Sequence, residues 1–245
     1  MSRKLLLAAA AAALLAAAPL SGLAQSAPAH IAAAIDDAAR PAAEKARDAA
    51  RKPAEMLAFA EVQPGQKVMD LIPGGGYFTR ILSKAVGPSG KVYAATSGQY
   101  AKQIEPVATD PAYANVQVVE PPIVAKPAEP LDLIFTAQNY HDLHLKQLGL
   151  DVPAFNKGLL DALKPGGLLV VVDHAAVAGA PIEVADSLHR IDPAVVRKEL
   201  EAAGFQFVAE NDAIRNPDDP KTANVFDPSI RAKTDQFVFK FRKPD

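Results

Sequence analysis

The sequence predicts an α/β fold: a single doubly wound sheet of seven strands, mostly parallel, with an antiparallel last strand. Short apolar segments alternate with helical ones along most of the 245 residues, which is the pattern of parallel strands joined by right-handed crossover helices. Glycine and proline turns punctuate these segments. The last two apolar segments are joined by a long irregular connection, so the final strand is expected to run antiparallel to its neighbours.

Each element follows from its local pattern. Strands are predicted at the short apolar segments, 68–72, 91–96, 116–119, 131–135, 168–172, 205–209 and 235–241. Helices are predicted where apolar residues recur at helical spacing or a cap is present, 53–60, 77–84, 99–107, 153–163 and 192–203. In the last helix Asp192 is an N-cap, Pro193 occupies the first turn and Gly204 ends the helix. The segments 121–130 and 211–233 contain four and three prolines and are expected to be irregular.

The first residues predict a secretory signal peptide over 1–24. Arg3 and Lys4 precede an apolar run over 5–20, and small residues follow before Ala24. The run is short for a helix that spans a membrane. We therefore expect cleavage after Ala24, export to the periplasm and no stable membrane span in the mature chain. A retained N-terminal anchor is the alternative.

Residues 25–52 are predicted to form an alanine-rich arm, helical or mobile, ahead of an α/β domain over 53–245. Alanine favours helix, but Ile31 and Ile35 are the only large apolar residues of the arm. We expect the arm to be helical and loosely packed. His30 is expected to be exposed to solvent.

The charge balance argues against nucleic acid as a partner. The chain has 26 Lys and Arg against 28 Asp and Glu, and loss of residues 1–24 would remove two basic groups and no acidic one, leaving 24 against 28. A net charge of −4 does not provide the basic surface that neutralises phosphates. A small molecule is the expected partner, and the oligomeric state is left open.

A glycine loop follows the first predicted strand. Asp70 lies near the end of that strand, and Tyr77 begins the next helix. The loop between them contains Ile72, Pro73, Gly74, Gly75 and Gly76. Proline fixes φ and glycine tolerates positive φ, so this loop must be tight. A strand, a glycine loop and a helix can hold a nucleotide or nucleoside at the helix N-terminus. A turn without a ligand is the alternative.

Histidines follow the fourth and fifth predicted strands. Ligands of open α/β sheets bind beyond the carboxyl ends of the strands. Tyr140, His141, Asp142 and His174 are therefore predicted to line a substrate pocket, with a histidine as general base or orienting group. His189 could fold over the same rim.

Two other interpretations of these residues stay open. One is a metal site drawn from a set of His and Asp side chains, which are His141, Asp142, His144, Asp173 and His174. The other is that they cap helices and satisfy backbone groups. His141 and His144 lack the four-residue step that places two imidazoles on one helix face, so no metal ligand is assigned. Arg190 is expected to be exposed, with pairing to Asp173 or Asp142 as the alternative.

Four motifs, taken in order, resemble those of class I S-adenosylmethionine-dependent methyltransferases. They are Val68-Met-Asp-Leu-Ile-Pro-Gly-Gly-Gly76, Gly90-Lys-Val-Tyr-Ala-Ala95, Leu131-Asp-Leu-Ile-Phe135 and Leu163-Lys-Pro-Gly-Gly-Leu-Leu-Val-Val-Val-Asp173. The resemblance covers about 53–245. It implies a Rossmann-like fold, S-adenosylmethionine as the cofactor and methyl transfer to a small-molecule acceptor.

The resemblance also implies a set of cofactor-binding residues on the rim. They are Asp70, Ile72, Pro73, Gly74, Gly75, Gly76, Tyr77, Thr96 and Asn139. Tyr77 would cover the cofactor and Asn139 would face the acceptor. In the family, a glycine is usual at Ile72, an acid that holds the ribose at Thr96, and an aspartate near the adenine at Glu120-Pro-Pro122. The missing ribose carboxylate and the expected export both favour the alternative function, a non-catalytic ligand- or metal-binding protein on a degenerate methyltransferase scaffold.

Overall fold

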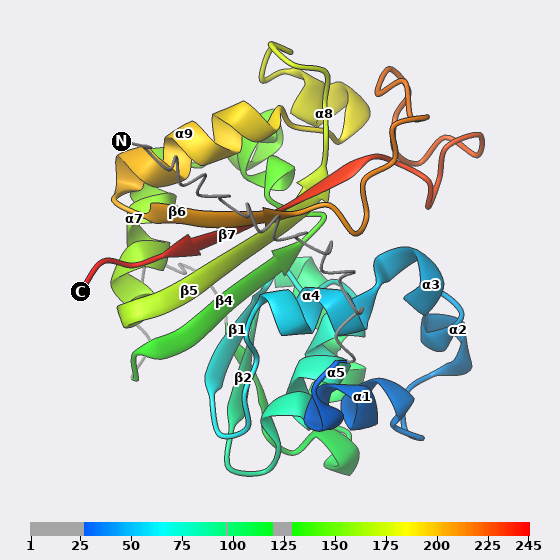
Figure 1. Ribbon diagram of the computed structural model, residues 1–245, viewed down its shortest axis with the longest axis vertical. Helices are drawn as coiled ribbons and strands as arrows, with labels where there is room; N and C mark the ends of the chain where they lie inside the picture. The colour runs from blue at the N-terminus through cyan, green and yellow to red at the C-terminus, as the bar shows by residue number, and fades with distance from the viewer. Residues whose placement is uncertain (1–26, 97, 120–128) are drawn as a thin grey trace, which may run out of the picture.

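The structure is a computed structural model that describes residues 27–96, 98–119 and 129–245. The predicted signal peptide over 1–24 and the Glu120-Pro-Pro122 stretch lie outside these residues. Figure 1 shows a twisted sheet with helices on both faces. The α/β fold expected from the sequence is confirmed.

The sheet has the strand order β3-β2-β1-β4-β5-β7-β6. Its strands are β1 (Lys67–Leu71), β2 (Lys91–Ala95), β3 (Val116–Val119), β4 (Leu131–Ala137), β5 (Leu163–His174), β6 (Gln206–Asn211) and β7 (Gln236–Arg242). All neighbours pair in parallel except β7, which runs antiparallel to both β5 and β6. The antiparallel last strand is thus confirmed.

Strand β7 pairs antiparallel with β6 at one edge of the sheet, across the long connection that joins them. It inserts between β5 and β6, and β6 is the edge strand. Burial agrees with this order, because β7 is buried along nearly its whole length while β6 has no fully buried residue. Phe237, Phe239 and Phe241 lie in one core cluster, as their alternation predicts.

Helices cover both faces of the sheet. The α-helices are α1 (Ala29–Asp36), α2 (Ala42–Lys45), α3 (Asp48–Arg51), α4 (Pro53–Phe59), α5 (Tyr77–Val86), α6 (Ala101–Ala108), α7 (Val152–Ala162), α8 (Val184–Leu188) and α9 (Pro193–Ala203). Short 3-10 turns are η1 (Gly98–Tyr100), η2 (Pro111–Tyr113), η3 (His141–His144) and η4 (Lys146–Leu148). One core cluster joins α1, α4, α5 and α6 to the sheet, and a second joins α7 and α9 to the other face.

The expectation that the arm is loosely packed is wrong. Ile31 and Ala34 of α1 are buried in the core cluster that contains α5. His30 is half-buried rather than exposed, with Nε2 2.8 Å from the carbonyl oxygen of Val62. Charged side chains add to this apolar anchoring.

A buried arginine holds the arm together. The guanidinium of Arg40, whose side chain is 0% exposed, donates to both carboxylate oxygens of Asp48, at 2.9 and 2.7 Å. Asp48 also accepts a 2.5 Å hydrogen bond from the hydroxyl of Tyr77, the first residue of α5. Glu44 pairs with Arg80 of α5 at 2.6 Å. The arm is therefore bonded to the start of the helix that follows the glycine loop.

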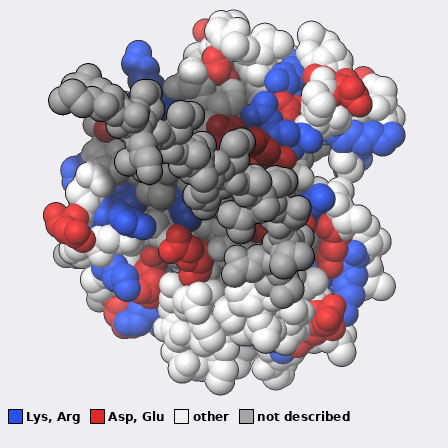
Figure 2. Space-filling view, viewed as in Figure 1, with Lys and Arg blue, Asp and Glu red and all other residues white. Residues whose placement is uncertain are grey.

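The charge distribution on the surface and the lengths of the helices are relevant to which partners the protein could have. Acidic and basic side chains are interspersed over the visible part of the face in Figure 2. Of the residues that the structure describes, none belongs to a helix long and apolar enough to cross a membrane.

Replacing Asp48 by alanine tests the anchoring of the arm. The change leaves Arg40 buried without its carboxylate, so we expect the free energy of unfolding to fall by about 2 to 4 kcal/mol. Asp161→Ala is the control, because it removes an exposed pair with Lys157 and should cost less than about 0.5 kcal/mol. Urea denaturation measures both. Equal losses in the two variants would show that Arg40 and Asp48 do not anchor the arm.

Candidate functional site

The candidate site lies where the strand order reverses. The chain moves outward from β1 to β3 and then returns to β4, on the other side of β1. The loops after β1 and β4 meet at this point, because the side-chain amide of Asn139 donates to the carbonyl oxygens of Ile72 at 2.9 Å and Ala137 at 2.6 Å. Ligands of doubly wound sheets bind at such a reversal.

The glycine loop is tight and open to its outer side. Ile72, Gly74 and Gly76 have positive φ angles of 56°, 54° and 87°. A Cβ atom added to Gly74 or Gly75 would meet no atom within 4 Å. Gly74 and Gly75 are exposed, and Ile72 and Pro73 do not pack over them.

Gly76 has a packing role that its sequence position did not reveal. A Cβ atom there would lie 2.7 Å from side-chain atoms of both Ile104 and Val107 in α6. Gly76 also precedes the first residue of α5, in the left-handed conformation. The positive φ and this close packing together favour glycine at this position, with or without a ligand.

Asp70 lies buried beneath the loop. Its Oδ2 accepts a 2.6 Å hydrogen bond from the hydroxyl of Thr79, one turn into α5. Burial raises the pKa of Asp70 to about 6, although the bond from Thr79 and the charge of Arg51 act in the opposite direction. The carboxylate thus joins the end of β1 to the helix that follows the loop.

Tyr77 does not occupy the place expected of it. Its side chain is buried, and its hydroxyl is bonded to Asp48 rather than pointing to a ligand. Instead the guanidinium of Arg51 lies over the rings of Tyr77 and Phe78, 4.3 and 4.8 Å from their centres. The hydroxyl of Tyr77 therefore bonds to the arm, and Arg51 of the arm packs on its ring.

Arg51 is a residue that sequence reasoning missed. Within the described ranges its guanidinium forms no hydrogen bond or ion pair, and burial together with the charge of Arg47 lowers its pKa to about 10. A partly buried cation without a bonded acid is stabilised by an anion. Nothing in the sequence around Arg51, which lies in an alanine-rich arm, predicts that it binds an anion.

Thr96 follows β2 on the same rim, as the resemblance implies. It is buried, and its amide donates to the carbonyl oxygen of Val119 at 3.0 Å. A hydroxyl at this position can form a bond to one ribose oxygen but lacks the second acceptor of a carboxylate.

Asp173, at the end of β5, organises the histidine side of the rim. This fully buried carboxylate accepts hydrogen bonds from the amide and Nδ1 of His141, at 2.7 and 2.8 Å, and from the amide of His174 at 2.7 Å. Burial lowers the pKa of His141, but the charges of Asp173 and Asp142 outweigh it and raise the pKa to about 10. In the absence of a metal, the two acids therefore favour the protonated form of His141.

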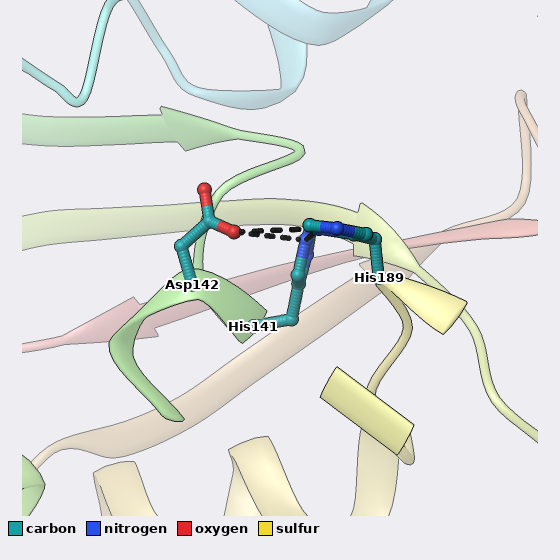
Figure 3. Close-up of side chains that lie close together, drawn as sticks. All are labelled: His141, Asp142 and His189. Carbon is teal, nitrogen blue, oxygen red and sulfur yellow. Dashed lines mark hydrogen bonds and ion pairs between the residues drawn. The ribbon is translucent and has the colours of Figure 1, made fainter. Parts of the chain in front are cut away.

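His189 completes a cluster with His141 and Asp142 (Figure 3). Its Nδ1 lies 3.3 Å from Nε2 of His141 and 3.7 Å from Oδ1 of Asp142, while the last two atoms are 3.1 Å apart. His189 ends α8 with a positive φ of 53°. The expectation that it folds over the rim is consistent with this position.

The structure separates the other predicted pocket residues from this cluster. His174 is buried beside it, where Nδ1 contacts the hydroxyl of Thr234 at 2.7 Å, and burial lowers its pKa to about 4. Tyr140 and His144 both reach Glu199 of α9, at 3.0 and 3.2 Å. Tyr140 and His144 therefore belong to the packing of helix against sheet, and only His141 and Asp142 reach the cluster.

Arg190 is buried, not exposed. Its side chain is 0% exposed and bonds to both carboxylate oxygens of Asp219, at 2.7 and 3.2 Å, and to the carbonyl oxygen of Ala175 at 3.0 Å. Asp219 lies in the long connection 212–235, which Figure 1 shows beyond the carboxyl ends of the strands. The pair fixes this connection next to the histidine cluster.

The pH dependence of stability tests the environment of Asp70. Its raised pKa favours folding below the ordinary value of 3.8, and this contribution is lost as the pH rises through about 6. Asp70→Asn keeps an acceptor for Thr79 but cannot ionise. We expect the wild type to lose on the order of 2 to 3 kcal/mol relative to the variant between about pH 4 and about pH 8. Urea denaturation across this range measures the difference, and parallel curves would contradict the assignment.

Solved structures share this architecture at low sequence identity. A SAM-dependent methyltransferase from Aquifex aeolicus has a TM-score of 0.59 at 21% identity, covering 81% of this chain and 93% of that one. Fibrillarin from Aeropyrum pernix, solved with natively bound S-adenosyl-L-methionine, has a TM-score of 0.53 at 16% identity, over 80% and 76%. The cyclase SpnF has a TM-score of 0.58 at 16% identity, over 83% and 81%.

Comparison at the level of sequence finds no matching family model and no matching curated protein. The strand order, the glycine loop after β1 and the similar solved structures all indicate the same fold. The chain therefore has the fold of the class I S-adenosylmethionine-dependent methyltransferases.

Proposed function

We propose that the protein binds S-adenosylmethionine at the carboxyl rim and transfers its methyl group to a small-molecule acceptor after export. The observation that carries this proposal is the open glycine loop at the reversal of strand order. The solved structure of fibrillarin holds S-adenosyl-L-methionine on the same fold. The export signal expected over 1–24 supports a periplasmic location.

The residues of the rim fit the groups of this cofactor. Gly74 and Gly75 are uncovered on their outer side, Asn139 is bonded to Ile72 of the loop, and Asp70 is bonded to Thr79 of the helix that follows. Arg51 offers a cation for the carboxylate of the methionine part, since no acid among the described residues is bonded to it. Thr96 would contribute one hydroxyl to the ribose.

The chemistry requires mainly positioning. The cofactor supplies a methyl group on a positively charged sulfur, and an acceptor must be aligned for an in-line displacement. The acids beside His141 favour its protonated form, and burial lowers the pKa of His174 to about 4, so neither histidine is assigned as the base.

A second candidate is ligand binding without methyl transfer. Thr96 lacks the carboxylate that holds the ribose in the family, and a cyclase shares the fold, so the fold alone does not determine the activity. Binding of S-adenosylhomocysteine would not separate the two candidates. A transfer assay with labelled S-adenosylmethionine and a pool of acceptors would separate them, because the second candidate predicts no transferred label.

Gly74→Ala tests whether the open loop is the cofactor site. Alanine at a positive φ should cost about 1 kcal/mol of stability, and the added methyl group should lower the affinity for S-adenosylhomocysteine at least 10-fold. Gly149→Ala is a matched control, because Gly149 has the same φ of 54° and equally open surroundings. Calorimetric titration measures the binding. Equal affinities of the two variants, or no binding by the wild type, would overturn the proposed site.

Arg51→Met tests the proposed role of the guanidinium. Methionine keeps an apolar chain over the two rings but loses the charge, so affinity for S-adenosylhomocysteine should fall about 10- to 100-fold. Arg47→Met is the control, since Arg47 lies over the same Tyr77 ring at 5.0 Å but is exposed. If both variants bind like the wild type, Arg51 does not contact the cofactor.

A further inference from the structure

We propose that His141, Asp142 and His189 form a binding site for one divalent first-row transition-metal ion of the Zn²⁺ or Fe²⁺ type. The three side chains come from η3 and from the end of α8, 47 residues or more apart in sequence, and meet at the carboxyl rim (Figure 3). This inference does not depend on methyl transfer, because it concerns donor atoms that the proposed cofactor contacts do not use.

The spacing of the donor atoms matches a single ion. Nε2 of His141, Oδ1 of Asp142 and Nδ1 of His189 form a triangle with sides of 3.1, 3.3 and 3.7 Å. The circle through these three atoms has a radius of about 2.0 Å, and zinc bonds to histidine nitrogen and carboxylate oxygen are about 2.0 to 2.2 Å long. An ion slightly out of the triangle plane could bond to all three atoms with almost no movement of the side chains.

The surroundings orient His141 as a metal ligand. The carboxylate of Asp173 accepts the Nδ1 proton at 2.8 Å, which leaves Nε2 as the atom that faces the triangle. A carboxylate behind a ligating histidine fixes the tautomer and orientation in known metal sites. Because Asp173 is 0% exposed and also bonded to two backbone amides, His141 is held in this orientation.

The backbone of His189 adopts an unfavourable positive φ that places its Nδ1 at the triangle. A histidine with φ of 53° is uncommon, and such strain persists where the surrounding structure imposes it. Bonds from Val225 to the carbonyl oxygen of Leu188 and from Asn224 to that of Ser187 hold the segment before it. The ring of Phe226 packs against His189 with centres 5.0 Å apart. The connection 212–235 therefore supports the second histidine.

The donor set leaves the ion open to a ligand. Two imidazoles and one carboxylate suit Zn²⁺ and Fe²⁺, and three protein donors leave one or more coordination positions free. Asp142 and His189 are about one quarter exposed, so an ion can enter from solvent. A small anionic or carbonyl-containing molecule is the class of ligand that such an open position takes.

The competing explanation is an imidazolium that donates to its neighbours and holds no metal. His141, protonated on both nitrogens, would satisfy Asp173 and Asp142 with the same contacts. The two explanations predict different metal binding. Only a metal site binds one ion per chain and loses affinity for it when His189 is replaced.

Titration of the tag-free protein with Co²⁺, after removal of metals by a chelator and then of the chelator, tests the inference. Bound Co²⁺ reports its coordination through visible absorption, and Zn²⁺ should displace it. We expect one Co²⁺ per chain in the wild type. His189→Ala and Asp142→Asn should each lower the affinity at least 10-fold, and Asp173→Asn should lower it about 10- to 100-fold through the orientation of His141.

His144→Ala is the matched control, since His144 belongs to the same 3-10 turn but faces Glu199. It should bind Co²⁺ like the wild type, and circular dichroism should show all variants folded. The inference is overturned if the wild type binds far less than one equivalent, or if His189→Ala binds as tightly as His144→Ala. Neither outcome depends on S-adenosylmethionine, so failure here leaves the proposed methyl transfer unaffected.

Discussion

A buried carboxylate at the end of β5 determines the geometry of the rim. Asp173 is fully inside the protein, and burying a charge is unfavourable unless it is bonded and neutralised. Two backbone amides and the ring of His141 satisfy it. Because one of those amides begins η3, the same bonds set the path of the chain after β4. The orientation of His141, and with it the cluster with Asp142 and His189, follows from this constraint.

The segments outside the sheet are attached by the same physical means. Arg40 is buried with Asp48 in the arm, and Arg190 is buried with Asp219 in the connection 212–235. A buried ion pair adds little net stability compared with apolar packing, but loss of one partner is costly. Such pairs therefore specify where a segment docks. The arm brings Arg51 over the rings of Tyr77 and Phe78 at the start of α5, and the connection supports His189. Both sides of the site therefore depend on segments outside the sheet.

Much of the fold could be predicted from sequence because its signals are local. Apolar segments located the strands, and the glycine loop between Asp70 and Tyr77 was placed at the correct rim. The place of β7 inside the sheet could not be read in this way, since strand order depends on pairing between distant segments. Packing of the arm was missed because Arg40 and Asp48 act as a buried pair, whereas isolated charges in a sequence indicate solvent.

The candidate site was predicted in part for the same reason. His141 and Asp142 follow the end of β4 within five residues, so the rule for open sheets found them. Tyr140, three residues after the strand, turns instead toward Glu199 and Asn156. His189 reaches the cluster only through the positive φ at the end of α8, which a single sequence does not show. Local patterns locate a rim, whereas side-chain direction depends on tertiary contacts.

A structure of the protein with S-adenosylhomocysteine tests the central claim most directly. The account predicts the ligand above Gly74 and Gly75, with its carboxylate at the guanidinium of Arg51 and its ribose next to Thr96. The arm would remain bonded to Tyr77 through Asp48. A ligand bound elsewhere, or a rim that stays free of ligand at saturating concentration, would contradict the claim that this rim is a cofactor site.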